Sequence, residues 1–105
     1  MCKVDILYDD SEFLISQCSN CKSISLYFQQ VIIKFKEEEF RNWYQVFFTS
    51  RFEKNAFIFP DDKIKNIIDT PYQELQLCLD KTQFKRLKEG IEQALHFKKI
   101  RDIMK

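Results

Sequence analysis

The sequence predicts an α+β fold, with a mostly antiparallel sheet and two helices packed on one of its faces. Apolar and polar residues alternate along several short stretches, which is typical of half-buried strands. In two longer stretches the apolar residues recur at helical spacing, which is typical of amphipathic helices. Two strand-like stretches are separated only by Gln29 and Gln30, and a connection this short favours antiparallel pairing.

Length and composition indicate one globular domain over residues 1–105. The chain has 105 residues, of which 45% are hydrophobic, 15% aromatic and 31% charged, unlike the composition of disordered chains. It contains eleven Phe and four Tyr, and each such ring can bury about 150–250 Å². We therefore expect a core that does not need disulfide bonds.

The first strands are separated by polar turns. Alternation over residues 4–8 and over residues 13–15 predicts two strands, and the polar run at 9–12 predicts the turn between them. Cys18-Ser19-Asn20-Cys21 predicts a second turn.

The clearest alternation covers residues 24–28 and 31–35. A two-residue turn between these strands would set the register, because turn length fixes which residues face each other. The expected pairs are Phe28 with Val31, Leu26 with Ile33, and Ile24 with Phe35. All six side chains then lie on one face of the hairpin, which we expect to be buried.

The hydrophobic period changes at Glu37, where a helix is predicted to begin. Acidic residues at 37–39 fall in its first turn, where the helix dipole favours negative charge. The expected buried face is almost wholly aromatic and consists of Phe40, Trp43, Tyr44, Phe47 and Phe48.

Residues 49–71 carry weaker signals. Residues 57–59, before Pro60, predict a short edge strand, and residues 64–68 fit either a strand or an irregular turn. Alternation over residues 75–79 predicts a further strand.

A second helix is predicted to follow Asp80. Asp80 is suited to cap it, with Gln83 as the reciprocal partner three residues later, and the helix can continue toward Met104. Its apolar face is formed by Phe84, Leu87, Ile91, Ala94 and Leu95.

Residues 75–91 resemble residues 31–47 at a fixed offset. The matching positions are Val31/Leu75, Ile33/Leu77, Phe35/Leu79, Phe40/Phe84, Trp43/Leu87 and Phe47/Ile91. A duplicated strand–turn–helix unit explains this match, and so does the chance similarity of any two such units of equal length.

The Cys18-x-x-Cys21 turn is the one motif with a chemical interpretation. Both sulfurs could bind one zinc ion, but a structural zinc site needs four ligands. Cys2, Cys78 and His96 could complete it only by converging in space, and a dimer could instead supply two Cys pairs. A redox role is not favoured, because a strand rather than a helix is expected to follow the motif. The remaining interpretation is a turn whose Cys residues pack as small apolar side chains.

The motifs between residues 18 and 95 resemble a family of small uncharacterised bacterial proteins of about this length. The similarity rests on the Cys-x-x-Cys turn, the alternating strands that follow, and the aromatic helix, and it extends to the Leu-rich strand and second helix. The motifs are Cys18-x-x-Cys21, Ile24-x-Leu26-x-Phe28, Glu39-Phe40-x-x-Trp43, Leu75-x-Leu77-x-Leu79 and Phe84-x-x-Leu87. The family pattern has Gly after the second Cys, where this chain has Lys22. The resemblance implies no activity and no catalytic residues.

Charge and composition argue against several function classes. The net charge of +1 provides no field that would recruit nucleic acid or an anionic membrane. With a single Gly the chain lacks the glycine-rich loops that cradle phosphates. No signal peptide and no membrane span are predicted, so we expect a cytoplasmic protein whose Cys residues are thiols or ligands. The sole histidine, His96, is expected on a helix surface.

These observations favour a non-catalytic domain that binds another protein or a second copy of itself as a homodimer. The alternative is a metal-binding accessory domain that holds zinc through Cys18 and Cys21. A small enzyme is the third possibility.

Overall fold

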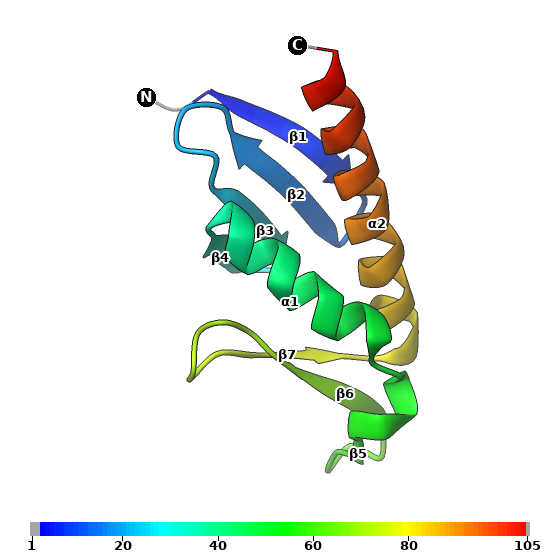
Figure 1. Ribbon diagram of the computed structural model, residues 1–105. Helices are drawn as coiled ribbons and strands as arrows, with labels where there is room; N and C mark the ends of the chain where they lie inside the picture. Colours follow the sequence, from blue (N-terminus) through cyan, green and yellow to red (C-terminus); the bar gives the residue numbers. More distant parts are fainter. Residues whose placement is uncertain (1–2, 105) are drawn as a thin grey trace.

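The computed structural model describes residues 3–104, in which seven strands and two α-helices confirm the α+β class. The strands form two antiparallel sheets, where the sequence predicts one (Figure 1). The larger sheet has the order β1-β2-β3-β4, with β1 Val4–Asp9, β2 Phe13–Cys18, β3 Ile24–Phe28 and β4 Val31–Phe35. The smaller sheet has the order β5-β6-β7, with β5 Ala56–Ile58, β6 Ile64–Asp69 and β7 Gln76–Leu79.

The β3–β4 hairpin has the predicted register. Phe28 pairs with Val31, Leu26 with Ile33, and Ile24 with Phe35. Five of these six side chains are buried, and Val31, beside the turn, is 41% exposed. Gln29 has a φ of 55°, which is the left-handed conformation that tight hairpin turns require.

The edge of β4 meets the connection between β6 and β7 of the smaller sheet. After β4 the chain enters α1 (Glu37–Thr49) and a short 3-10 helix (Phe52–Asn55), so it reaches β5 away from this edge. The Tyr72 hydroxyl, from the connection between β6 and β7, donates a hydrogen bond to the carbonyl of Lys34 in β4. The edge of the larger sheet is thus met by a side chain rather than by another strand.

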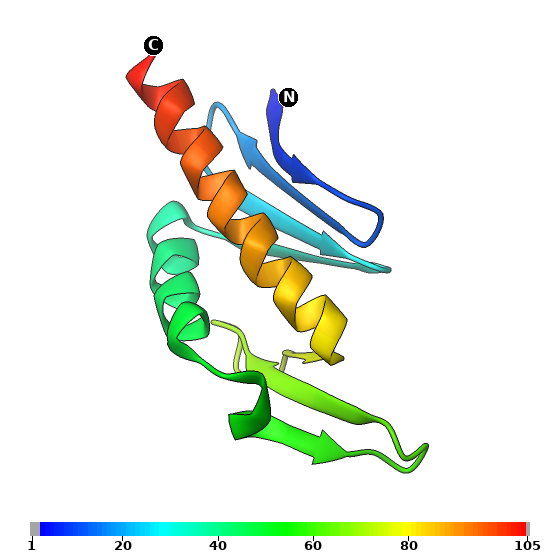
Figure 2. The same ribbon diagram turned by 90° about the vertical axis from the view of Figure 1, so that its right-hand side faces the viewer.

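Helix α2 (Lys81–Ile103) joins the two sheets, and it extends close to Met104 as predicted. It contacts β1 and β2 of the larger sheet and β6 and β7 of the smaller one. In Figures 1 and 2 it runs along the long axis of the molecule, whose extents are 48 × 25 × 24 Å. At Gly90 the helix passes the ring of Tyr8 so closely that a Cβ would lie 2.6 Å from Cε2.

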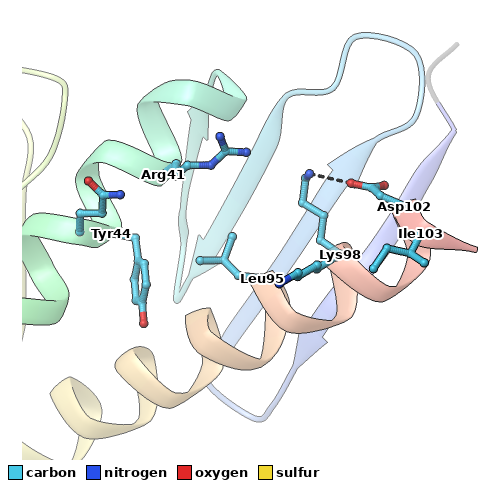
Figure 3. A pocket seen from close by; sticks show the side chains of 8 residues that line it. Arg41, Tyr44, Leu95, Lys98, Asp102 and Ile103 are labelled. Carbon is cyan, nitrogen blue, oxygen red and sulfur yellow. Dashed lines mark hydrogen bonds and ion pairs between the residues drawn. The ribbon is translucent and has the colours of Figure 1, made fainter.

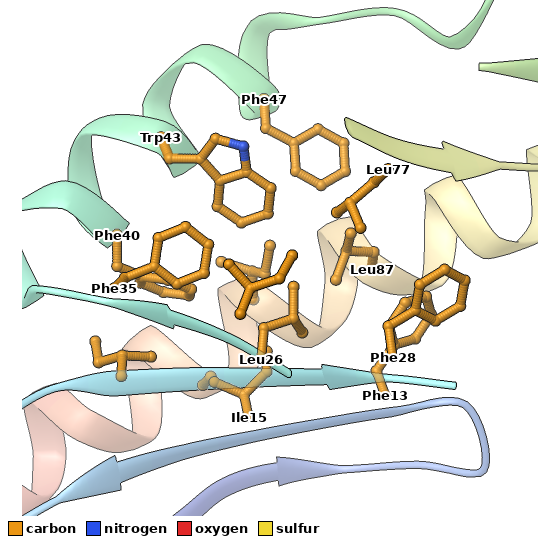
Figure 4. Close-up of a cluster of buried hydrophobic side chains, with 14 of the residues drawn as sticks. Phe13, Ile15, Leu26, Phe28, Phe35, Phe40, Trp43, Phe47, Leu77 and Leu87 are labelled. Atoms are coloured by element: carbon orange, nitrogen blue, oxygen red, sulfur yellow. The ribbon is translucent and has the colours of Figure 1, made fainter. Parts of the chain in front are cut away.

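One hydrophobic core lies between the helices and both sheets (Figure 4). Trp43 of α1 stacks on Phe35 of β4 with ring centroids 5.1 Å apart, and Phe47 meets Phe84 of α2 edge-on at 5.1 Å. The core includes residues of the larger sheet, the smaller sheet and both helices: Ile15, Leu26, Ile33, Ile68, Leu77, Leu79, Phe40, Leu87 and Ile91. The aromatic face predicted for α1 is therefore buried at Phe40, Trp43 and Phe47, whereas Phe48 is 51% exposed.

The two strand–turn–helix units bury matching positions. Ile33, Phe35, Phe40, Trp43 and Phe47 are buried in the first unit. Their partners at the fixed offset are buried in the second: Leu77, Leu79, Phe84, Leu87 and Ile91. The units belong to different sheets, and their helices have 13 and 23 residues. Duplication and chance similarity both remain interpretations of this match.

The predicted cap of α2 is confirmed. Asp80 Oδ1 accepts a hydrogen bond from the Gln83 amide at 2.8 Å, and Gln83 Oε1 accepts one from the Asp80 amide at 3.1 Å.

We expect Asp80→Ala to lower the free energy of unfolding by about 0.5–2 kcal/mol, because amides of the first turn lose their acceptor. Asp80→Ser keeps an acceptor and should lose much less. Thermal unfolding followed by circular dichroism measures both variants. Equal melting temperatures for Asp80→Ala and the parent chain would contradict the role of this cap.

Candidate functional site

The Cys-x-x-Cys turn connects β2 to β3. Cys18 ends β2 and is buried, whereas Cys21 is exposed. Cys18 Sγ accepts a hydrogen bond from the Cys21 amide at 3.5 Å, and Cys21 Sγ lies 3.5 Å from the Ser23 hydroxyl oxygen. Lys22 has a φ of 64°, in the left-handed region that favours glycine.

The other proposed metal ligands lie on different elements. Cys78 is an exposed residue of β7 in the smaller sheet, and His96 is exposed on α2. Cys2 lies outside the described residues. Within residues 3–104, no group of three or more His, Cys, Asp or Glu side chains is placed to hold a metal ion. The turn itself thus offers two of the four ligands of a structural zinc site, and zinc binding at Cys18 and Cys21 stays a prediction.

His96 lines a surface cavity of about 430 Å³ together with Leu7, Glu92, Gln93, Phe97 and Ile100. Glu92 is the one carboxylate among these lining residues, and it also bonds to Tyr44. A histidine that acts as a general base needs a substrate position within hydrogen-bond reach and a group that orients its ring. The mostly apolar lining offers little to fix such a substrate.

The largest of the cavities described is a groove of about 570 Å³ between α1 and α2 (Figure 3). Tyr44 of α1 and Leu95 and Ile103 of α2 supply its apolar surface. Charged and polar side chains complete the lining: Arg41, Gln45, Lys98, Lys99 and Asp102. An apolar strip bordered by charged groups is the usual composition of a protein-binding surface.

Lys98 forms a charged bridge at one end of the groove. Its Nζ lies 2.9 Å from Asp102 Oδ2 and 3.2 Å from Glu37 Oε1. Burial acts to lower the pKa of Lys98, but its hydrogen bonds to Asp102 and Glu37 outweigh this effect and raise the pKa. The hydrogen bond from Lys98 is the main reason that the pKa of Asp102 is lowered.

The bridge is consequently charged at neutral pH. The stability that this bridge contributes is lost at alkaline pH, when Lys98 loses its proton at its raised pKa. It is also lost at acidic pH, when Asp102 is protonated at its lowered pKa.

The environment of the Tyr44 hydroxyl includes a carboxylate of α2. Burial, together with the charge and hydrogen bond of Glu92, raises the pKa of Tyr44 to about 12. The phenol therefore stays protonated at neutral pH and donates to Glu92.

A buried polar cluster connects the Cys turn to the end of the groove. Gln17 is 1% exposed, and its Nε2 donates to the Lys22 carbonyl at 3.0 Å and to Glu37 Oε2 at 2.9 Å. Its Oε1 accepts from Arg101 of α2, which also donates to Asp5 Oδ2 at 2.9 Å. The sequence analysis did not identify Gln17 or Arg101. A signal was present, because Gln17 continues the inward-facing alternation of Phe13 and Ile15 in β2.

No family model, curated protein or solved structure matches this chain. None of the helices in the part of the chain that the structure describes is long and apolar enough to span a membrane.

Proposed function

We propose that this chain is a non-catalytic protein-interaction domain, and that the groove between α1 and α2 is its binding surface. The observation that carries the proposal is the apolar strip of Tyr44, Leu95 and Ile103 between two helices. A groove of this kind is suited to the apolar face of an amphipathic helix. The occupant is a helix of another protein, or a helix of a second copy of this chain in a homodimer.

The charged groups around the groove support binding rather than catalysis. Lys98 is bridged by Asp102 and Glu37, and the Tyr44 hydroxyl is bonded to Glu92. Groups that satisfy each other in this way stiffen a surface and leave its shape ready for a partner. A binding partner then loses less entropy on association than it would with a mobile surface.

Ile103→Glu tests the groove directly. The side chain is 73% exposed, so a charge there should disturb the apolar strip without unfolding the chain. The matched control is Ile58→Glu in β5, where the isoleucine is 74% exposed and lies outside the groove. Partners captured from the source cells are quantified by mass spectrometry, and self-association of the purified chain is measured by sedimentation velocity.

We expect Ile103→Glu to weaken the association at least about tenfold, because burying a charge in an apolar contact costs more than about 1.4 kcal/mol. Ile58→Glu should leave the association unchanged. If both variants bind like the parent chain, or if only Ile58→Glu loses binding, the α1–α2 groove is not the binding surface.

A further inference from the structure

The larger sheet has a free edge along β1. Among residues 3–104, the only strand that pairs with β1 is β2. Figures 1 and 2 show β1 at the margin of the sheet. The opposite edge, at β4, is met by the Tyr72 hydroxyl. Native proteins commonly protect a free edge with Pro or Lys, but β1 carries Val4 and Ile6, each 55% exposed.

The backbone of Val4 and Ile6 faces the open side of this edge. The Lys3 carbonyl accepts a hydrogen bond from the Ser19 amide at 2.7 Å, so Lys3 faces the β2 side. In an antiparallel ladder, successive residues turn their N–H and C=O groups alternately toward one neighbour and the other. Asp5 consequently faces β2, whereas Val4 and Ile6 each turn one donor and one acceptor outward. A register shift directly after Ile6 ends this pattern.

Helix α2 adds an apolar flank beside the edge. Its Arg101 pairs with Asp5 at 2.9 Å. Its Gly90 passes the ring of Tyr8, so the helix runs antiparallel to β1. Because α1 contacts β4 on the far side of the sheet, the flank of α2 that lines a cavity with Leu7 borders the β1 edge. The large apolar side chains exposed there follow helical spacing: Phe97 at 49%, Ile100 at 44% and Met104 at 81%.

We propose that a second copy of this chain pairs with the β1 edge, so that the two four-stranded sheets join into one. Val4 pairs with Ile6 of the second copy, and Ile6 with its Val4, about a twofold axis at Asp5. Each pair exchanges two hydrogen bonds, so all the outward backbone groups of Val4 and Ile6 are used. Sliding the pairing toward Tyr8 would lose hydrogen bonds, because β1 bulges there.

The charges near the axis are compatible with this pairing. The two Asp5 side chains face each other, and like charges directly opposite are destabilising. Each Asp5, however, is paired with Arg101 of its own copy at 2.9 Å. Lys3 lies on the same face of β1, diagonal to Asp5 of the second copy and within reach of a long side chain. Cationic groups of the two copies therefore compensate both carboxylates.

The two α2 helices are correctly spaced to pack on each other across the axis. Arg101 bonds to Asp5 of β1 and to Gln17 of β2, so the helix lies over the gap between these strands. With neighbouring strands about 4.8 Å apart, the two helices pass about 10 Å from each other, at the upper end of the usual packing distance. Ile100 then meets Ile100 of the second copy, and Phe97 meets its Met104.

The size of the contact indicates a weak, reversible dimer. Standard interfaces have about 20–30 residues a side and bury about 800 Å² per partner. The β1 edge and the α2 flank supply roughly ten residues per copy, which corresponds to roughly 300–400 Å². The contact is separate from the α1–α2 groove, which lies on the opposite flank of α2, so either proposal can fail alone. It leaves that groove for a helix of another protein.

Amide exchange of the full chain, followed by NMR at about 20 µM and about 1 mM, tests the pairing without a substitution. The amides of Val4 and Ile6 are hydrogen-bonded only in the dimer, so their exchange should slow at least about twofold at the higher concentration. Ile32 is the internal control. It is 54% exposed, and its amide faces outward at the β4 edge, as does the carbonyl of Lys34 two residues later. Unchanged exchange at Val4 and Ile6, or equal slowing at Ile32, would overturn the proposal.

Sedimentation velocity of variants gives an independent test. Val4→Pro removes an outward N–H without removing a bond to β2, and Phe97→Glu places a charge in the α2 flank. Each should weaken the dimer at least about tenfold. The matched controls, Ile32→Pro at the β4 edge and Phe48→Glu, 51% exposed on α1, should leave it unchanged. Ile103→Glu should also leave it unchanged. Loss of the dimer with Ile103→Glu alone, or a parent chain that is monomeric at about 1 mM, would contradict pairing through β1.

Discussion

Trp43→Ala is expected to lower the free energy of unfolding by about 3–5 kcal/mol, as truncation of large aromatic residues in a core does. Trp43 is 7% exposed and stacks on Phe35. It also contacts Phe40 and Phe47 at centroid distances of 6.0 and 5.6 Å. Its indole Nε1 donates to the Asp69 carbonyl at 2.7 Å and so ties α1 to the smaller sheet. Alanine removes these contacts together.

Two further variants separate packing from hydrogen bonding. Trp43→Phe keeps a ring and loses the indole donor, so the expected loss is about 1–3 kcal/mol. Val46→Ala, on the same helix and 69% exposed, should stay within about 0.5 kcal/mol of the parent chain. Urea unfolding is followed by far-UV circular dichroism, because the two Trp43 variants lack the fluorescent residue. A loss under about 1 kcal/mol for Trp43→Ala would mean that α1 does not pack as described.

Sequence patterns predicted the features that depend on neighbouring residues. The register of the β3–β4 hairpin followed from a two-residue turn, and the start of α2 followed from Asp80 and Gln83. The edge strand predicted at 57–59 is found one residue earlier, at 56–58, and residues 64–69 form the strand rather than the irregular turn of the two alternatives. Each of these features depends on residues that are close together in the sequence. Hydrophobic periodicity and capping motifs can therefore predict it.

The features that sequence patterns missed depend on residues far apart in the chain. Alternation shows which face of a strand is buried, but it does not show which strand lies beside it. The division into two sheets was therefore not predicted. Gly90 within a helix has no local explanation either, because the close neighbour is the Tyr8 ring.

The candidate sites show the same difference between features that nearby residues determine and features that depend on the whole fold. The Cys-x-x-Cys motif is visible in the sequence, but whether further ligands converge on it depends on the fold. Asn66 of β6, which is 1% exposed, has only a weak signal in the sequence, because it is a polar residue between apolar positions. Its side-chain amide donates to the Phe52 carbonyl, 14 residues earlier in the chain, and the sequence pattern does not show that contact.

Leu87→Ala is expected to lower the free energy of unfolding by about 2–5 kcal/mol. We expect the two sheets to be destabilised by the same amount. Leu87 is 0% exposed and belongs to the same buried cluster as Leu26 of the larger sheet and Leu77 of the smaller one (Figure 4). Because α2 contacts both sheets, a cavity at Leu87 should weaken the packing of both sheets against this helix. A single domain then unfolds in one cooperative step.

Amide hydrogen exchange measures this prediction residue by residue. In a single cooperative unit, the most protected amides of β2 and of β6 report the same free energy of opening, and Leu87→Ala lowers both by the same amount. Lys85→Ala, exposed on the neighbouring turn of α2, is the control and should change either value by at most about 0.5 kcal/mol. If Leu87→Ala reduced protection in one sheet and left the other unchanged, the two sheets would be separate folding units. The shared core would then be a contact between two units rather than the centre of one domain.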